Sequence, residues 1–102
     1  NNSVTTDLLT VSSVNHDVSK TYTKLPKVII VSSMAPDDKN FVTGVIYISG
    51  ADSAISNVVT IYFEGGSTAT ILANVSMSSK TLTLTLRNVV FDDKQIRFVE
   101  LY

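Results

Sequence analysis

The chain has 102 residues, of which 44% are hydrophobic and 17% are charged, and its formal net charge is −1. This composition is typical of one globular domain and not of a disordered chain. The low net charge, without a basic block, argues against nucleic-acid binding. The apolar runs are far shorter than the roughly 20 residues that a membrane-spanning helix needs. The chain contains no cysteine, which excludes disulfides and thiolate chemistry.

The chain opens with a polar stretch, residues 1–7, that we expect to be a linker or an N-terminal arm. Residues 8–102 are expected to form a single domain. Strand patterns recur in it about every ten residues, with turn residues between them. The expected strands are residues 8–14, 18–23, 28–31, 41–49, 55–64, 68–77, 81–87 and 95–102.

A run of four β-branched residues, Val28 to Val31, follows a corner at Pro26. Such residues pack well on a pleated sheet and poorly in a helix. Because both faces of this run are apolar, we expect a central strand that is covered on both sides.

The clearest alternation lies at residues 81–87, where Leu82, Leu84 and Leu86 are expected to point inward and the threonines between them outward. No segment shows helical periodicity over ten or more residues. We therefore predict an all-β fold, an antiparallel β-sandwich of about 6–8 strands with Greek-key or jelly-roll connections.

Catalytic residues are few. The single histidine, His16, lies in an expected turn between Asn15 and Asp17, and no serine stands in a nucleophile-elbow context. One histidine without cysteines cannot supply a usual zinc site. We expect no enzyme, no cofactor and no metal, and we interpret His16 as a solvated turn residue.

Two loops repeat the tripeptide Asp-Asp-Lys. Carboxylates paired in this way could coordinate Ca²⁺ or accept hydrogen bonds from sugar hydroxyls. They could equally be solvated turns, because aspartate and asparagine favour turn conformations. The candidate ligand-binding residues are Asp37, Asp38, Asn40, Asp92 and Asp93.

Three expected strand segments, residues 28–31, 41–48 and 58–63, are apolar on both faces. A two-layer sandwich covers only one face of each sheet with its own partner layer. The second faces must therefore be covered by loops or by another copy of the chain. The candidate interface residues are Tyr47, Val58 and Tyr62.

The stretch Val18-Ser19-Lys20-Thr21-Tyr22-Thr23-Lys24-Leu25-Pro26-Lys27-Val28-Ile29-Ile30-Val31 resembles a module at the C-termini of bacteriophage tail-fibre and baseplate proteins. That module is similar to the H-type lectins, and the segment Ile96-Arg97-Phe98-Val99-Glu100-Leu101-Tyr102 resembles the last strand of that family. The resemblance covers residues 18–31 and 81–102, about a third of the chain.

This resemblance implies a lectin-like sandwich that forms a homotrimer. It also implies a receptor-binding head on a virion, outside the cell, that attaches to carbohydrate on a host surface without inserting into the membrane. The H-type lectins carry a tryptophan–histidine pair in a sugar-contacting loop, whereas this chain has no tryptophan and only His16. No sugar-binding residue is therefore transferred. The alternative is a structural module that trimerises or caps a fibre and binds no ligand.

Overall fold

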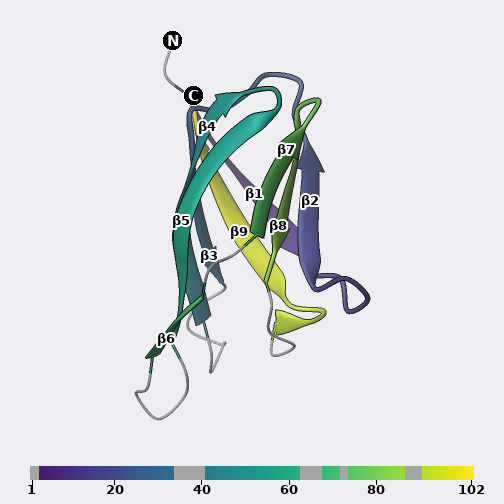
Figure 1. Cartoon of the computed structure of the whole chain (residues 1–102), viewed down its shortest axis with the longest axis vertical. Coiled ribbons are helices and arrows are strands. Elements are labelled where there is room, and N and C mark those ends of the chain that lie inside the picture. Colours follow the sequence, from purple (N-terminus) through teal and green to yellow (C-terminus); the bar gives the residue numbers. More distant parts are fainter. Residues whose placement is uncertain (1–2, 34–40, 63–67, 72–73, 87–90) are drawn as a thin grey trace.

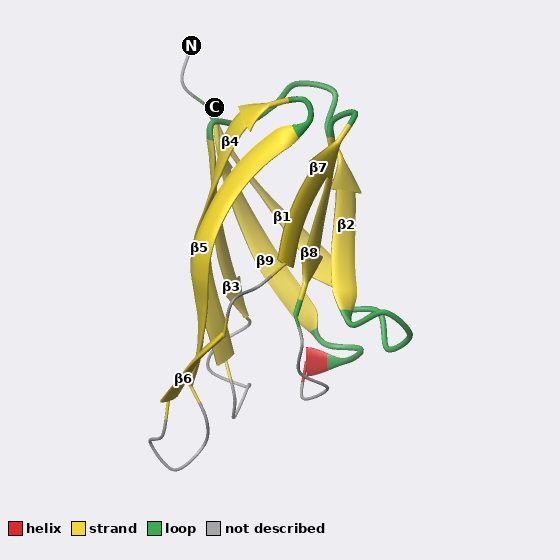
Figure 2. Ribbon diagram, viewed as in Figure 1, coloured by secondary structure: helices red, strands yellow, loops and turns green. Residues whose placement is uncertain are grey.

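The computed structural model describes residues 3–33, 41–62, 68–71, 74–86 and 91–102; at 41, 56–62 and 68–71 it describes the backbone only. This part of the chain contains strands, loops and one short 3₁₀ turn at Phe91, which is drawn red in Figure 2, but no α-helix. The strands are β1 (Val4–Thr10), β2 (Asp17–Thr21), β3 (Val28–Ser33), β4 (Phe41–Gly50), β5 (Ser53–Tyr62), β6 (Thr68–Ile71), β7 (Asn74–Ser78), β8 (Thr81–Thr85) and β9 (Gln95–Leu101).

The strands form two antiparallel sheets, ordered β1-β9-β3-β4-β5-β6 and β2-β8-β7. The smaller sheet covers one face of the larger sheet (Figure 1). The predicted all-β antiparallel sandwich is therefore confirmed. Strand β3 lies between β9 and β4, as its β-branched sequence predicts for a central strand. The expectation that both of its faces are covered is wrong for the single chain, because Ile30 on the second face is 39% exposed.

The observed strands differ most from the predicted ranges at three places. The expected N-terminal arm is already strand from Val4, because β1 pairs with the last strand and places Val4 opposite Leu101. The first strand ends at Thr10 and not at residue 14. The strand expected over residues 68–77 is two strands in different sheets, β6 beside β5 and β7 beside β8. An unbroken strand pattern does not reveal this change of sheet.

The core fills the space between the two sheets. Alternate residues of β3 and β9, such as Ile29 and Phe98, face alternate residues of β2 and β8, such as Val18 and Leu84. The inward alternation predicted for residues 81–87 is confirmed at Leu82, Leu84 and Leu86, which are fully buried. The buried core side chains are Val11, Val18, Tyr22, Ile29, Val31, Val42, Ile46, Met77, Leu82, Leu84, Leu86, Phe91, Ile96 and Phe98.

The hairpin between β7 and β8 has only two residues in its turn, Ser79 and Lys80, and both have positive φ angles of 48° and 66°. Two central turn residues with positive φ angles are typical of a type I′ turn, whose twist matches that of the flanking strands. The Lys80 backbone N–H donates to the Ala51 carbonyl at 2.9 Å, which joins this hairpin to the β4–β5 turn.

Candidate functional site

The outer face of the six-stranded sheet carries two adjacent rows of side chains that cross several strands. Directly opposite residues of neighbouring strands point to the same side of a sheet, so the pairing register defines each row. The first row runs Val4, Leu101, Val28, Tyr47 and Ile55 across β1, β9, β3, β4 and β5. The second row runs Thr6, Val99, Ile30 and Val45. We call these nine residues the outer apolar face; Thr6 is its one polar member, and none of the nine side chains is charged.

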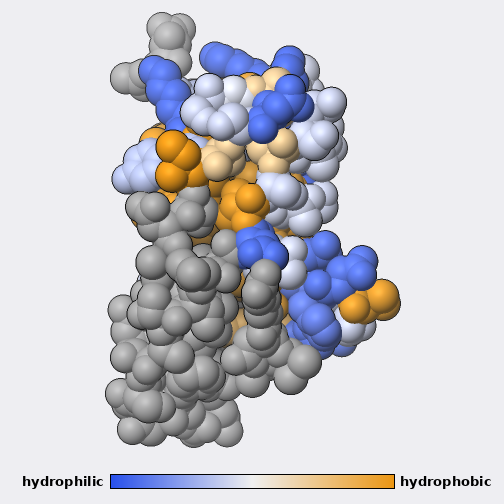
Figure 3. Space-filling view, in the orientation of Figure 1, coloured by the Kyte–Doolittle hydropathy of each residue, from blue (hydrophilic) through white to orange (hydrophobic). Residues whose placement is uncertain are grey.

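Much of the outer apolar face is exposed to solvent. The exposed fractions of Val4, Ile30, Val45, Tyr47 and Ile55 lie between 38% and 63%. Within the described residues, the chain leaves these side chains uncovered. Hydrophobic surface is visible over the upper part of β4 and β5, beneath the hydrophilic loops (Figure 3). The prediction that several strands are apolar on both faces is thus confirmed for β3 and β4, and Tyr47 lies on the second face.

Two further interface residues of the sequence-based prediction, Val58 and Tyr62, belong to β5, but their side chains lie outside the described residues.

The outer face of the three-stranded sheet has the opposite character. Its rows consist of Asp17, Thr85 and Asn74, then Ser19, Thr83 and Ser76, then Thr21, Thr81 and Ser78. Hydroxyl groups pair across the strands, with Thr21 Oγ1 and Thr81 Oγ1 2.8 Å apart and Ser19 Oγ and Thr83 Oγ1 3.3 Å apart. Such pairs stabilise neighbouring strands while keeping the surface polar.

The loops at the end of the sandwich opposite the chain termini bring His16 and Asp92 together, with His16 Nδ1 2.7 Å from Asp92 Oδ1. His16 therefore has a side-chain partner that its interpretation as a solvated turn residue did not include. The Asp93 backbone has a φ of 65°, and its N–H donates to the Val11 carbonyl at 2.9 Å. These geometries agree with the turn interpretation of this Asp-Asp-Lys loop.

The other Asp-Asp-Lys loop, with Asp37, Asp38 and Asn40, lies outside the described residues. Of the five candidate ligand-binding residues, the structure thus describes only Asp92 and Asp93. Among the residues searched, which exclude this loop, no group of three or more metal-ligating side chains occurs.

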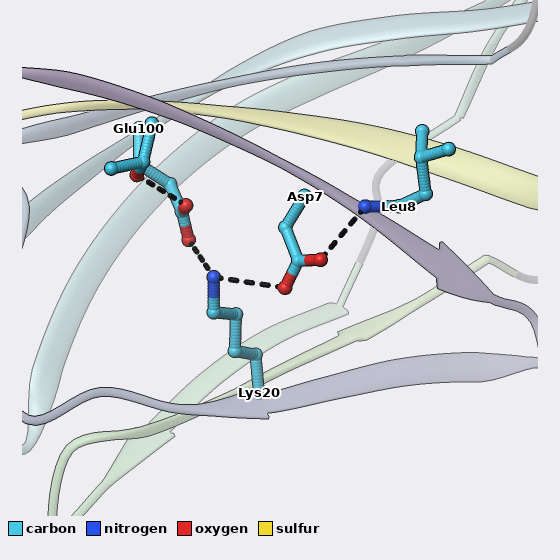
Figure 4. Close-up of polar contacts among 5 residues, drawn as sticks. Asp7, Leu8, Lys20 and Glu100 are labelled. Carbon is cyan, nitrogen blue, oxygen red and sulfur yellow. Dashed lines mark hydrogen bonds and ion pairs between the residues drawn. The ribbon is translucent and has the colours of Figure 1, made fainter.

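A cluster of charged side chains lies between the two sheets. Lys20 of β2 reaches across the sandwich, and its Nζ donates to Glu100 Oε2 of β9 at 2.6 Å and contacts Asp7 Oδ2 of β1 at 3.0 Å (Figure 4). The second carboxylate oxygen of Glu100 accepts a hydrogen bond from Thr5 Oγ1 at 2.7 Å. Glu100 has no exposed surface. A buried charge of this kind requires a partner, and Lys20 supplies it.

Tyr22 borders the cluster. Lys20 Nζ lies 4.9 Å from the centre of its ring, close enough for a cation–π contact. Its hydroxyl is the one buried side-chain polar atom without a hydrogen-bond partner in the described part of the chain. Burial, and after it the Glu100 carboxylate, raises the pKa of Tyr22 far above its ordinary value of 10.0.

The pKa of Lys20 responds to two opposing effects. Burial lowers it, but hydrogen bonds to Glu100 and Asp7 and the charges of both carboxylates outweigh burial, so that the net pKa is raised above 10.5. Lys20 is therefore an ammonium ion at neutral pH.

The predicted site residues do not include this cluster, although the alternation of the strands contains a signal for it. Lys20 shares its strand face with Val18 and Tyr22, and Glu100 shares its face with Ile96 and Phe98. A charged residue at an inward position of each of two strands indicates a buried ion pair. The partnership itself requires the packing of β2 against β9, which the sequence does not reveal.

No family model, no curated protein and no solved structure matches this chain. In the described residues, no helix has the length and apolar character needed to cross a membrane.

Proposed function

We propose that this domain is a structural assembly module whose copies pack together through the outer apolar face. The observation that carries the proposal is the pair of adjacent apolar rows across β1, β9, β3, β4 and β5. Of these strands, β9, β3 and β4 already bury their other face in the core. Apolar side chains on the outer side contribute little to the fold of one chain, and exposed rows of this kind mark interaction surfaces.

The size and character of the face favour a second copy of the chain as its partner. The face spans five strands, and five of its members are among the exposed large hydrophobic residues of the chain. Contiguous apolar surface of this kind is uncommon on a soluble monomer. The nine side chains of the outer apolar face carry no charge, although Arg97, which lies opposite Leu8, borders the face on the same side of the sheet. A face of this character fits another apolar sheet face.

The number of copies and the biological setting rest on the sequence resemblance. The resemblance to tail-fibre and baseplate modules selects three copies and a position at the tip of a viral fibre. The apolar face alone requires only that there be more than one copy.

Charge substitutions test the proposal. Tyr47→Asp and Val4→Asp place a carboxylate at two positions of the same row, and we expect each to weaken association by about 100-fold or more, since an unpaired buried charge costs several kcal/mol. Val14→Asp is the matched control, because Val14 is 81% exposed in the β1–β2 loop and lies outside the face. Sedimentation velocity would measure the assembly and circular dichroism the strands. Equal association of all three variants and the unsubstituted chain would refute the proposal.

Recognition of host-surface carbohydrate is the second candidate function. The observation that favours it is the loop end where His16 meets Asp92 and where Asp93 is exposed, since carboxylates and imidazoles hydrogen-bond sugar hydroxyls. Binding of the assembled domain to a glycan array, lost in Asp93→Ala and retained in Asp52→Ala, would support it. Absence of glycan and host-cell binding with the assembly intact would contradict recognition and leave the assembly module.

A further inference from the structure

The Lys20 cluster combines an amine and two carboxylates inside a sandwich that has no disulfide. The three groups come from β2, β1 and β9, and therefore from both sheets. Lys20 Nζ contacts both carboxylates at once, at 2.6 Å to Glu100 Oε2 and 3.0 Å to Asp7 Oδ2 (Figure 4). Groups held at such distances react far faster than the same groups free in solution.

We propose that Lys20 and Asp7 condense to a side-chain amide, an isopeptide bond, with Glu100 as the proton carrier. A bond forms between Lys20 Nζ and the Asp7 carboxyl carbon, and the bond between that carbon and Oδ2 breaks. Two protons leave the ammonium nitrogen and depart with Oδ2 as one water molecule. Glu100 starts and ends as a carboxylate, so the reaction needs no oxidant, reductant or further reagent.

The contacts of Asp7 distinguish its two oxygens. Asp7 Oδ1 accepts a hydrogen bond from the Leu8 backbone N–H at 2.9 Å, whereas Oδ2 lies beside the amine. The Leu8 N–H therefore stabilises negative charge on Oδ1 during the attack, as an oxyanion hole does. Oδ2 is the oxygen next to the nitrogen that supplies the protons, which makes it the leaving oxygen.

Glu100 is placed to remove the proton that blocks the attack. Lys20 is charged at neutral pH, and only its neutral amine is a nucleophile. The contact from Lys20 to Glu100 is the shortest in the cluster, so this carboxylate is the group that takes the ammonium proton. The reaction occurs once in the life of each chain, so a small population of neutral amine is sufficient.

The isopeptide bond would link the two sheets covalently. β1 and β2 are edge strands of different sheets, and the bond would join them across the side of the sandwich. It would also replace the Lys20 ammonium and the Asp7 carboxylate, whose side chain is 44% exposed, by a neutral amide. The amide N–H would take over the hydrogen bond to Glu100 that the ammonium donates now. Like a disulfide, it would restrict the unfolded chain by closing a loop, here in a protein without cysteine.

The mass of the purified full chain tests this proposal. We expect an intact mass lower than that of the sequence by one water molecule. Proteolysis at Asp17, the one aspartate between Asp7 and Lys20, should leave the two resulting fragments joined. Lys20→Arg keeps a positive charge beside both carboxylates but cannot condense, and Asp7→Ala removes the acceptor. Both variants should have their full sequence mass, whereas Lys27→Arg, an exposed lysine outside the cluster, should remain lighter by one water.

The Glu100→Gln variant tests whether Glu100 carries the proton, because the proximity of Lys20 and Asp7 is unchanged in it. This variant keeps Lys20 and Asp7, so a chain that folds but retains its full mass would support the carrier role. Two results would overturn the proposal. One is an unsubstituted chain with the full sequence mass after prolonged incubation. The other is a lighter chain whose fragments separate after cleavage at Asp17, as a cyclised aspartate within one fragment would give.

Discussion

The outer faces of the two sheets differ sharply although the strands behind them share one core. The six-stranded sheet exposes Val4, Ile30 and Tyr47 in apolar rows, whereas the three-stranded sheet exposes hydroxyls such as those of Thr21 and Thr81. Threonine keeps the preference of a β-branched residue for strands and stays hydrated, so the second surface needs no cover. The smaller sheet therefore suits contact with water, and the larger sheet is the face through which we propose that copies pack.

The largest expected difference in stability is between substitutions of two neighbouring residues on opposite faces of β3. Ile29 is fully buried and Ile30 is 39% exposed. At a concentration where the chain is single, Ile29→Ala should lower the free energy of unfolding by about 2–5 kcal/mol because it leaves a cavity. Ile30→Ala should lower it by about 1 kcal/mol or less. Urea unfolding measures both, and similar losses would show that the outer face is already covered within one chain.

The pH dependence of the free energy of unfolding tests the buried hydroxyl of Tyr22, which differs from the exposed hydroxyls of the smaller sheet. The pKa of Tyr22 is raised in the folded state, so its contribution to stability is complete below its unfolded pKa of about 10 and is lost as pH rises above that value. Above pH 10 the unfolded chain holds fewer protons than the folded chain, and the free energy of unfolding should fall by about 1.4 kcal/mol per pH unit from this group. The slope should be shallower by that amount in Tyr22→Phe; an unchanged slope would contradict the account of a buried, unpartnered hydroxyl.

The smallest expected change in stability concerns the hydroxyl-rich outer face of the three-stranded sheet. Thr21 and Thr81 lie directly opposite each other, with their hydroxyls 2.8 Å apart. A double-mutant cycle with Thr21→Val and Thr81→Val should give a coupling energy of about 0.2–1 kcal/mol, the usual range for cross-strand pairs. The double variant should keep its strands and become less soluble, since it gives the smaller sheet an apolar surface. Unchanged solubility would contradict the claim that the hydroxyl groups keep the smaller sheet soluble without cover.

Local patterns predicted much of the fold because burial in a sheet repeats every second residue. The alternation of Leu82, Leu84 and Leu86 identified their inward positions, and the four β-branched residues from Val28 identified the central strand. The split of residues 68–77 between two sheets was missed, because both pieces have strand-forming sequences and the pattern does not specify the partner strand.

The candidate sites were predicted less well than the fold. The double-faced strands indicated an apolar second face, and Tyr47 lies on it. The contact between His16 and Asp92, 76 residues apart, and the cluster around Lys20 depend on which loops and strands meet. Contacts between segments that are distant in the sequence depend on the topology, and a single sequence carries little information about them.

Association of the unsubstituted chain tests the central claim most directly. Static light scattering over a concentration series, up to high micromolar, gives the molar mass without a label or a surface. The account predicts a mass several times that of one chain, three times if the resemblance holds, that decreases toward that of one chain on dilution. The mass of a single chain throughout the series would contradict the claim that the outer apolar face is covered by other copies.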